Sequence, residues 1–180
     1  PCGDARYTTP KVIAARIYVR PSDPPVSGED TPTPGARGSA HGTYLAGIVA
    51  GLPLTATYLG VPVPISGLAP ASWLMNYRVF YPSVAGREVA YTAELLAAVE
   101  DAVADGADVI LAGWTAPSGM IPGASPLSLA LEAAMDTGCV VVASAGNGGP
   151  QYGSATGSPG GEERVLTVGA SSKGQVLVGD

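Results

Sequence analysis

The sequence predicts an α/β fold with a mainly parallel sheet and helices on both faces, organised as one domain over residues 1–180. Strand and helix patterns alternate along the second half of the chain, which is the order that right-handed crossovers between parallel strands produce. Several predicted strands are short, continuous runs of Val, Ile and Ala, as expected of strands that are buried on both faces.

The first half of the chain predicts few regular elements. Residues 11–19 form the first predicted strand, and residues 20–38, rich in Pro, Gly, Ser and Asp, predict a surface loop that acts as a plain connector. Residues 41–50 predict a helix, because apolar residues recur there at helical spacing. Residues 54–67 are apolar and interrupted by prolines, which favours a hairpin.

The second half shows regular alternation. The predicted strands are residues 72–80, 108–112, 139–144 and 164–170. The predicted helices are residues 88–105 and 126–136, and a glycine stops each of them. A polar, glycine-rich loop is expected over residues 150–163.

The composition favours a globular domain and argues against nucleic-acid binding. Hydrophobic residues make up 46% of the chain, enough to build a core. The formal net charge is −6 and only two lysines are present, whereas phosphate binding needs clustered Lys and Arg. No apolar run reaches the roughly 18 residues of a membrane-spanning helix. Cys139 lies in an apolar run and is expected to be a buried thiol, and the pairing of Cys2 stays open.

In parallel sheets, catalytic groups gather beyond the carboxyl ends of the strands. This directs attention to two positions, one at the start of a predicted helix and one after a predicted strand. His41, the single histidine, opens the predicted helix and could act as a general base, although a lone histidine is more often structural. Asn147 lies between glycines after a predicted strand, where Asn is usually a turn residue. Its side-chain N–H could also donate to a developing oxyanion. A phosphate loop is excluded, because neither glycine-rich phosphate motif is present.

Together, these motifs resemble the subtilase family, the subtilisin-like serine proteases, over roughly residues 11–172. The similar blocks, in the family's order, are His41-Gly42-Thr43, Gly67-Leu68-Ala69-Pro70, Gly106 to Ile110, Ala143 to Pro150 and Val165 to Ala170. The resemblance implies a partial subtilisin-like fold and a polypeptide substrate. It implies that His41 is the general base, that Asn147 donates to the oxyanion, and that both face one cleft.

The resemblance also implies two strands that would hold an extended peptide by main-chain hydrogen bonds. One strand is Gly113, Trp114 and Thr115, and the other is Ser83, Val84, Ala85 and Gly86. Trp114 could equally be a core aromatic residue. Tyr44 stands where the family commonly has a second histidine, which is not the base.

Two triad members are missing from their expected blocks. No aspartate upstream of His41 is followed by Ser/Thr-Gly, and the chain contains no Gly-Thr-Ser. We expect the aspartate before this segment and the serine after it, which is the order of the family's triad. The large subtilases have a protease-associated domain inserted between the asparagine and serine blocks, and we expect such an insertion near residue 180. The chain alone is therefore expected to lack peptidase activity.

An alternative is a subtilase-like binding or scaffold module that no longer cleaves. The aspartate and serine blocks on either side of the segment would distinguish an enzyme from such a module. Calcium is common in the family, but no dense Asp, Asn and Glu cluster has ligand spacing, so no metal site or cofactor is predicted. A secreted or cell-surface location is implied by the resemblance only.

Overall fold

The computed structural model describes residues 2–115, 123–149 and 157–171, which form parts of two compact units. The N-terminal unit comprises residues 1–107 and the C-terminal unit residues 108–180. The single domain over residues 1–180 stays a prediction. The last residues, near which an inserted domain is expected, lie outside the described ranges.

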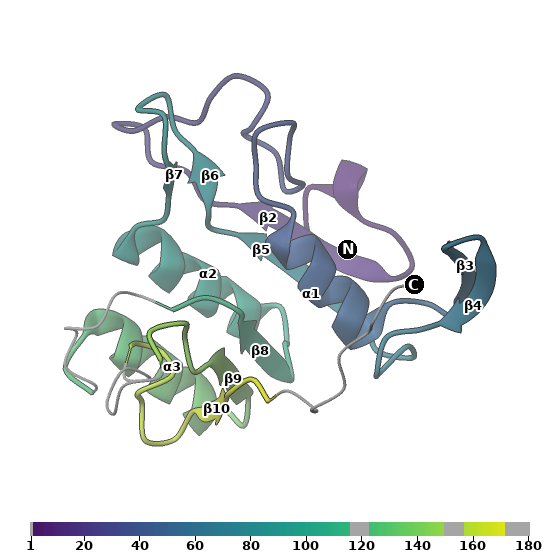
Figure 1. Cartoon of the computed structure of the whole chain (residues 1–180). Helices are drawn as coiled ribbons and strands as arrows, with labels where there is room; N and C mark the ends of the chain where they lie inside the picture. The colour runs from purple at the N-terminus through teal and green to yellow at the C-terminus, as the bar shows by residue number, and fades with distance from the viewer. Residues whose placement is uncertain (1, 116–122, 150–156, 172–180) are drawn as a thin grey trace. The chain divides into compact units, whose positions relative to one another are not determined.

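The N-terminal unit has a parallel sheet in the order β1-β2-β5 and two antiparallel pairs, β3-β4 and β6-β7 (Figure 1). Its strands are β1 (Cys2–Gly3), β2 (Val12–Ile17), β3 (Leu54–Tyr58), β4 (Val61–Ile65), β5 (Leu74–Arg78), β6 (Tyr81–Pro82) and β7 (Glu88–Val89). Its helices are η1 (Ala5–Tyr7), α1 (His41–Ala50) and α2 (Thr92–Ala104). The predicted helix 41–50 and the hairpin within 54–67 are confirmed.

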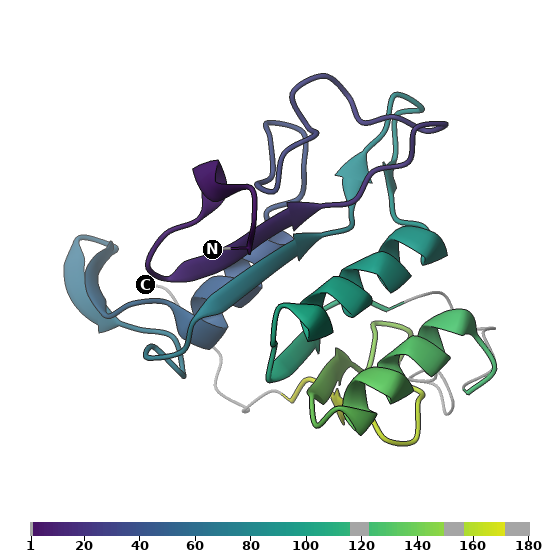
Figure 2. The same cartoon turned by 180° about the vertical axis from the view of Figure 1, so that it is seen from behind.

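The two faces of the β1-β2-β5 sheet receive different partners, because side chains alternate along a strand. Arg16 of β2 and Tyr77 of β5 both bond the carboxylate of Asp105 at the end of α2, at 2.8 Å each. Asn76 and Arg78 of β5 point to the opposite face and bond the loop before α1. Figures 1 and 2 show α1 on that opposite face. The loop that ends at His41 therefore lies against the sheet.

The C-terminal end of α1 is held by the segment that follows the β3-β4 hairpin. The backbone amides of Gly67, Leu68 and Ala69 donate to carbonyls in the last turn of the helix and at Gly51, at 2.7 to 3.0 Å. These carbonyls have no partner inside the helix, so the segment satisfies groups that would otherwise need water. A Cβ on Gly67 would overlap the backbone nitrogen of Gly51, so this approach requires glycine.

Helix α2 begins later than predicted. Residues 88–89 form β7 and pair with β6, so the prediction that the helix starts at residue 88 is wrong. Tyr91, the residue before α2, is extended, with φ −119° and ψ 154°. The strand pairing, which sequence periodicity does not report, therefore determines the start of the helix.

The described part of the C-terminal unit is a parallel sheet in the order β10-β9-β8 with one helix. Its elements are β8 (Val109–Ala112), α3 (Pro126–Asp136), β9 (Val140–Ser144) and β10 (Leu166–Val168). Helix α3 has the predicted bounds, because Ser125 caps it by accepting from the Ser128 amide and Pro126 starts its first turn. It buries Leu127 and Leu131 and contacts β9.

The strands of this unit are not buried on both faces. Val141 and Ala143 of β9 are buried, whereas Val109, Leu111 and Val140 expose 57%, 45% and 49% of their surface. The expectation of burial on both faces is wrong here, because α3 is the one helix described in this unit and covers one face. Cys139 is buried, as predicted.

Candidate active site

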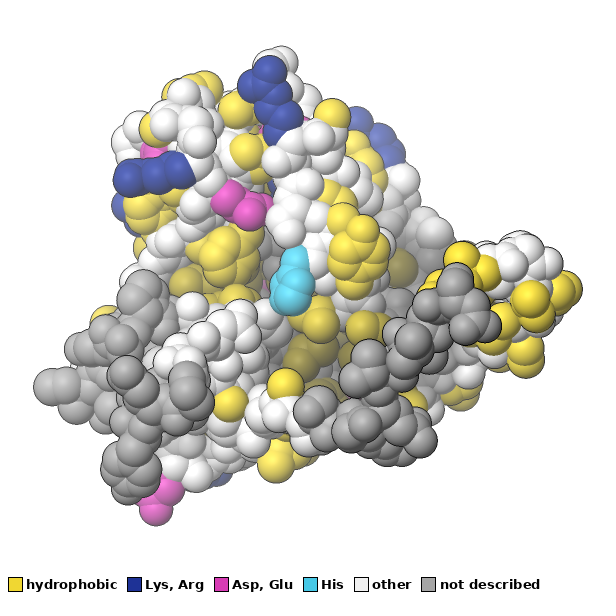
Figure 3. All heavy atoms as spheres, viewed as in Figure 1, with side chains coloured by type: hydrophobic (Ala, Val, Ile, Leu, Met, Phe, Trp, Pro, Cys, Tyr) yellow, Lys and Arg dark blue, Asp and Glu magenta, His cyan; other side chains and the backbone are white. Residues whose placement is uncertain are grey.

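His41 is the first residue of α1, and its side chain is exposed. The histidine is visible in cyan on the surface in Figure 3. Its backbone amide donates to the Ser39 hydroxyl at 3.2 Å, and the Tyr44 amide donates to the Ala40 carbonyl at 3.0 Å. These bonds order the first turn of the helix and place the imidazole at its N-terminal end.

The β6-β7 hairpin contacts the loop that leads into His41. Glu88 of β7 accepts a hydrogen bond from the Ser39 amide at 3.3 Å. The turn of this hairpin contains the predicted substrate-binding residues 83–86, so the N-terminal unit brings this segment near the residues preceding His41. The amides of Ser83 and Val84 already donate to Arg87 and Pro24 carbonyls, at 2.9 and 3.2 Å. Their binding of a peptide stays a prediction.

Asn147 is exposed and lies three residues beyond the carboxyl end of β9. The loop between them is anchored by two backbone donors: Ala145 bonds the Val168 carbonyl at 2.9 Å, and Gly146 bonds the Ser144 hydroxyl at 3.0 Å. Gly146 has a φ of +86°, a conformation that favours glycine. The Asn147 side chain is thus presented from an ordered turn.

The predicted substrate strand Gly113–Thr115 lies beside the loop of Asn147. The Thr115 hydroxyl donates to the Ser144 carbonyl at 3.3 Å, and its methyl group approaches Gly146. Both segments follow the carboxyl ends of adjacent parallel strands, β8 and β9. The C-terminal unit therefore brings together two of the predicted site elements. Trp114 is half-buried, which leaves its role open.

Two buried glutamates were missed by sequence reasoning. Glu29 lies in the predicted connector 20–38 and pairs with Arg78. Glu162 lies in the predicted loop 150–163 and accepts from the Ser128 hydroxyl at 2.5 Å and the Gly123 amide at 2.7 Å. Neither loop shows periodicity, so no sequence signal marked these residues.

Two of the three aspartates upstream of His41 have structural partners. Asp4 caps η1 and binds Arg6, and Asp23 accepts from the Tyr91 hydroxyl. The one Asp-Thr-Gly in the chain begins at Asp136, which ends α3, is 70% exposed and pairs with Arg164 at 2.7 Å. It follows a helix and lies after His41 in the chain, unlike the family's aspartate block.

His41 and Asn147 belong to different units, so their common cleft stays a prediction. Among the described residues, no cluster of three or more His, Cys, Asp or Glu could hold a metal ion. No helix within the described ranges has the length and hydropathy needed to cross a membrane.

The chain is similar to one protein family and to several known proteases. The model of the subtilase family matches residues 14–178. The chain is 39% identical over 145 residues to the minor extracellular protease Vpr of Bacillus subtilis (strain 168), covering 79% of the chain and 16% of Vpr. It is 33% identical over 162 residues to the subtilisin-like protease SBT2.3 of Arabidopsis thaliana, covering 83% of the chain and 18% of that protease.

A solved structure of a mutant protease domain of PatA superposes with a TM-score of 0.58 and 24% identity, covering 91% of the chain and 53% of that protease-domain chain. This likeness supports the fold alone. The chain spans 16% and 18% of the length of the two curated relatives above.

Proposed function

Because the chain belongs to the subtilase family, we propose that it supplies the general base, His41, and the oxyanion donor, Asn147, of a serine endopeptidase. The observation that carries this proposal is positional. His41 opens α1, and Asn147 follows the carboxyl end of β9, as the resemblance requires of both blocks. The nucleophile and the aspartate would come from other parts of the protein.

In this reaction, His41 takes the proton from a serine hydroxyl as the serine oxygen attacks the carbonyl carbon of the peptide bond. The imidazolium then gives this proton to the leaving amine, and water completes the second half of the reaction with the same base. The exposed imidazole at the start of α1 is accessible for both transfers.

Asn147 would stabilise the negative charge that develops on the carbonyl oxygen. A donor is effective when it is held in place before the charge appears, because no reorganisation is then needed. The backbone bonds of Ala145 and Gly146, with the contact from Thr115, hold the loop of Asn147 in this manner.

The proposed substrate is a polypeptide bound in extended form. Residues 113–115 continue from β8, which is an edge strand of its described sheet. The resemblance assigns these residues to one side of the substrate site, where main-chain hydrogen bonds would hold an extended peptide. Since one relative is named an extracellular protease, we also propose a secreted location for the protein.

Hydrolysis of fluorescein-labelled casein by the intact protein tests this function. The wild-type protein should release labelled peptides. His41→Ala should reduce kcat by about 10²–10⁴-fold, the usual contribution of a general base. Casein binding without cleavage by the wild-type protein would instead support a non-catalytic binding module. Residues 1–180 alone should not cleave, because the serine nucleophile is missing.

A further inference from the structure

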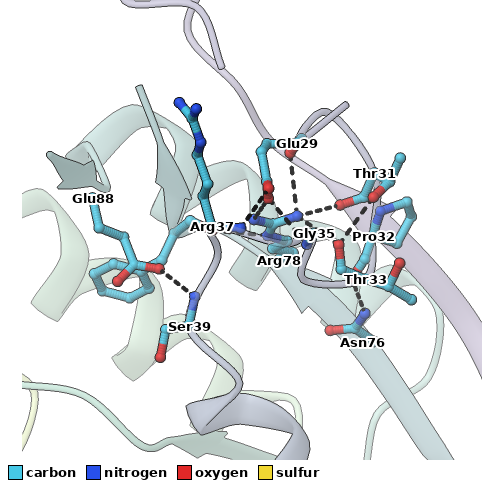
Figure 4. Close-up of polar contacts among 11 residues, drawn as sticks. Glu29, Thr31, Pro32, Thr33, Gly35, Arg37, Ser39, Asn76, Arg78 and Glu88 are labelled. Carbon is cyan, nitrogen blue, oxygen red and sulfur yellow. Dashed lines mark hydrogen bonds and ion pairs between the residues drawn. The ribbon is translucent and has the colours of Figure 1, made fainter. Parts of the chain in front are cut away.

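A buried ion pair fastens the loop before His41 to strand β5. Arg78 Nη2 lies 3.4 Å from Glu29 Oε2, and the two side chains expose only 9% and 5% of their surface. Figure 4 shows Arg78 reaching from the strand into the loop, with Glu29 against it. We call these two residues the Glu29–Arg78 pair.

Arg78 also binds the backbone of the loop. Its Nη1 donates to the carbonyls of Glu29, Thr31 and Thr33, at 3.2, 2.8 and 2.6 Å. Asn76, two residues earlier on the same face of β5, donates to the Pro32 carbonyl at 2.6 Å. Four loop carbonyls in five residues are therefore bound by side chains of one strand.

Glu29 binds the other half of the loop. Its carboxylate accepts from the backbone amides of Gly35 at 3.0 Å and Arg37 at 2.9 Å. The Arg37 amide, helped by Gly35 and the Arg78 guanidinium, holds the pKa of Glu29 below its ordinary value. A Cβ on Gly35 would overlap the carboxylate, and a Cβ on Gly38 would lie 2.9 Å from Arg78 Nη2. The loop backbone is packed directly on the pair.

Only two residues separate Gly38 from His41, and both ends of this stretch are held. The Ser39 amide bonds Glu88, and the Ser39 hydroxyl accepts from the His41 amide. The conformation imposed on residues 29–38 is therefore passed to the first turn of α1 through a short, bonded connection.

Net stability does not explain the choice of a buried ion pair at this place. Removing two charges from water costs about as much as their attraction returns, and well-packed apolar side chains often serve as well or better. An apolar pair, however, could not bind three loop carbonyls and two amides in fixed directions. The bonds of the Glu29–Arg78 pair specify one loop conformation in a segment without regular structure.

We propose that Glu29 and Arg78 are positioning residues that place the His41 imidazole for proton transfer. This inference rests on the proposed peptidase function and deepens it, because it assigns a role in the reaction to residues to which the resemblance gives none. Misplacing a catalytic group by about 1 Å can cost about 10²-fold in rate, so a loosened loop should be seen in turnover.

The test compares Arg78→Met, Arg78→Lys and Arg16→Met in the intact protein. Arg16 is the matched control, because it pairs with Asp105 at 2.8 Å on the opposite face of the same sheet. Hydrolysis of an internally quenched peptide, chosen from a positional library, is measured well below the melting temperature of every variant. Hydrogen exchange of the Gly38 and Tyr44 amides is measured on the same samples.

We expect Arg78→Met to lower kcat by about 10–100-fold while KM changes less than about threefold. Arg78→Lys should restore part of kcat, since an ammonium group keeps the charge and some of the donors. Arg16→Met should lower stability and leave kcat unchanged. The Gly38 and Tyr44 amides should exchange at least about tenfold faster in Arg78→Met and at the wild-type rate in Arg16→Met.

Wild-type kcat in folded Arg78→Met, or an equal loss of kcat in Arg16→Met, would overturn the positioning role and leave the peptidase function standing. A wild-type protein that does not cleave, or a fully active His41→Ala, would overturn the function. Hydrogen exchange would then decide alone whether the pair orders the start of α1. If Arg78→Met does not fold, Arg78→Lys carries the same comparison with a smaller expected loss.

Discussion

Glu29 in the N-terminal unit and Glu162 in the C-terminal unit are similarly buried, at 4% and 5% exposure, yet they are bound differently. Arg78 and two backbone amides bind Glu29. Glu162 accepts instead from two serine hydroxyls, of Ser128 and Ser158, and from one amide. Each glutamate orders a loop near one predicted site residue, but only one of them does so with a partner charge.

The difference follows from the groups that surround each carboxylate. The loop of Glu29 presents many backbone carbonyls, which require a donor-rich cation such as arginine. The Glu162 carboxylate bonds the Ser128 hydroxyl in the first turn of α3, where the positive end of the helix favours a carboxylate without a cation. Gly160, close to Glu162 in the chain, packs against the Ser144 carbonyl, where a Cβ would lie 2.5 Å away. This packing connects the Glu162 loop with the end of β9, before Asn147.

The largest loss of activity is expected when the proposed oxyanion donor, Asn147, is removed, and a purely structural substitution in the same unit should cost far less. Asn147→Ala should lower kcat by about 10²–10³-fold with little change in KM, the range known for the corresponding donor of a subtilisin. Steady-state kinetics of peptide hydrolysis measure this loss. Ser125→Ala, which removes the cap of α3 and the hydrogen bond between the Ser125 and Ser128 hydroxyls, is the control within the same unit. A loss of equal size in the control would mean that folding, not oxyanion binding, is being measured.

A medium effect should distinguish the two glutamates. Glu29→Gln places an amide NH₂ against donors that cannot accept a hydrogen bond, so the melting temperature should fall by several degrees. Glu162→Gln should lower the melting temperature less, because the serine hydroxyls can turn to accept from the new NH₂ group. Thermal denaturation of both variants checks this, and equal losses would contradict the distinction.

The smallest expected effect is on the stability of the fold at low pH. The Arg16 guanidinium, with the Tyr77 hydroxyl, lowers the pKa of Asp105 from 3.8 to about 2. Because the folded pKa lies below the unfolded one, this stabilisation is present above about pH 4 and is lost as the pH falls through about 2. Asp105→Asn should remove about 1–2 kcal/mol of acid-sensitive stability. Denaturant unfolding between pH 5 and 2 should therefore show a shallower pH dependence in the variant.

The comparison also shows which features could be predicted from the sequence. Helices α1 and α3 have the predicted bounds, because apolar periodicity, Ser125 and the closing glycines are local signals. The His41 and Asn147 motifs are likewise local. The Glu29–Arg78 pair joins residues 49 positions apart, and no local pattern indicates such a contact.

Short pairings escaped prediction for a similar reason. β1, β6 and β7 have two residues each, too few for an alternation, and their existence depends on the partner strand. The predicted burial of β8 and β10 followed from composition, whereas Leu111, Leu166 and Val168 are exposed. Composition reports that a strand is apolar but not which layers cover it.

The central claim is that His41 activates a serine nucleophile located outside residues 1–180, and fluorophosphonate labelling of the intact protein tests it most directly. We predict that mass spectrometry will find the label on a serine outside this segment, and that His41→Ala will react far more slowly. Labelling of His41→Ala at the wild-type rate, or no labelling of the wild-type protein, would contradict the claim.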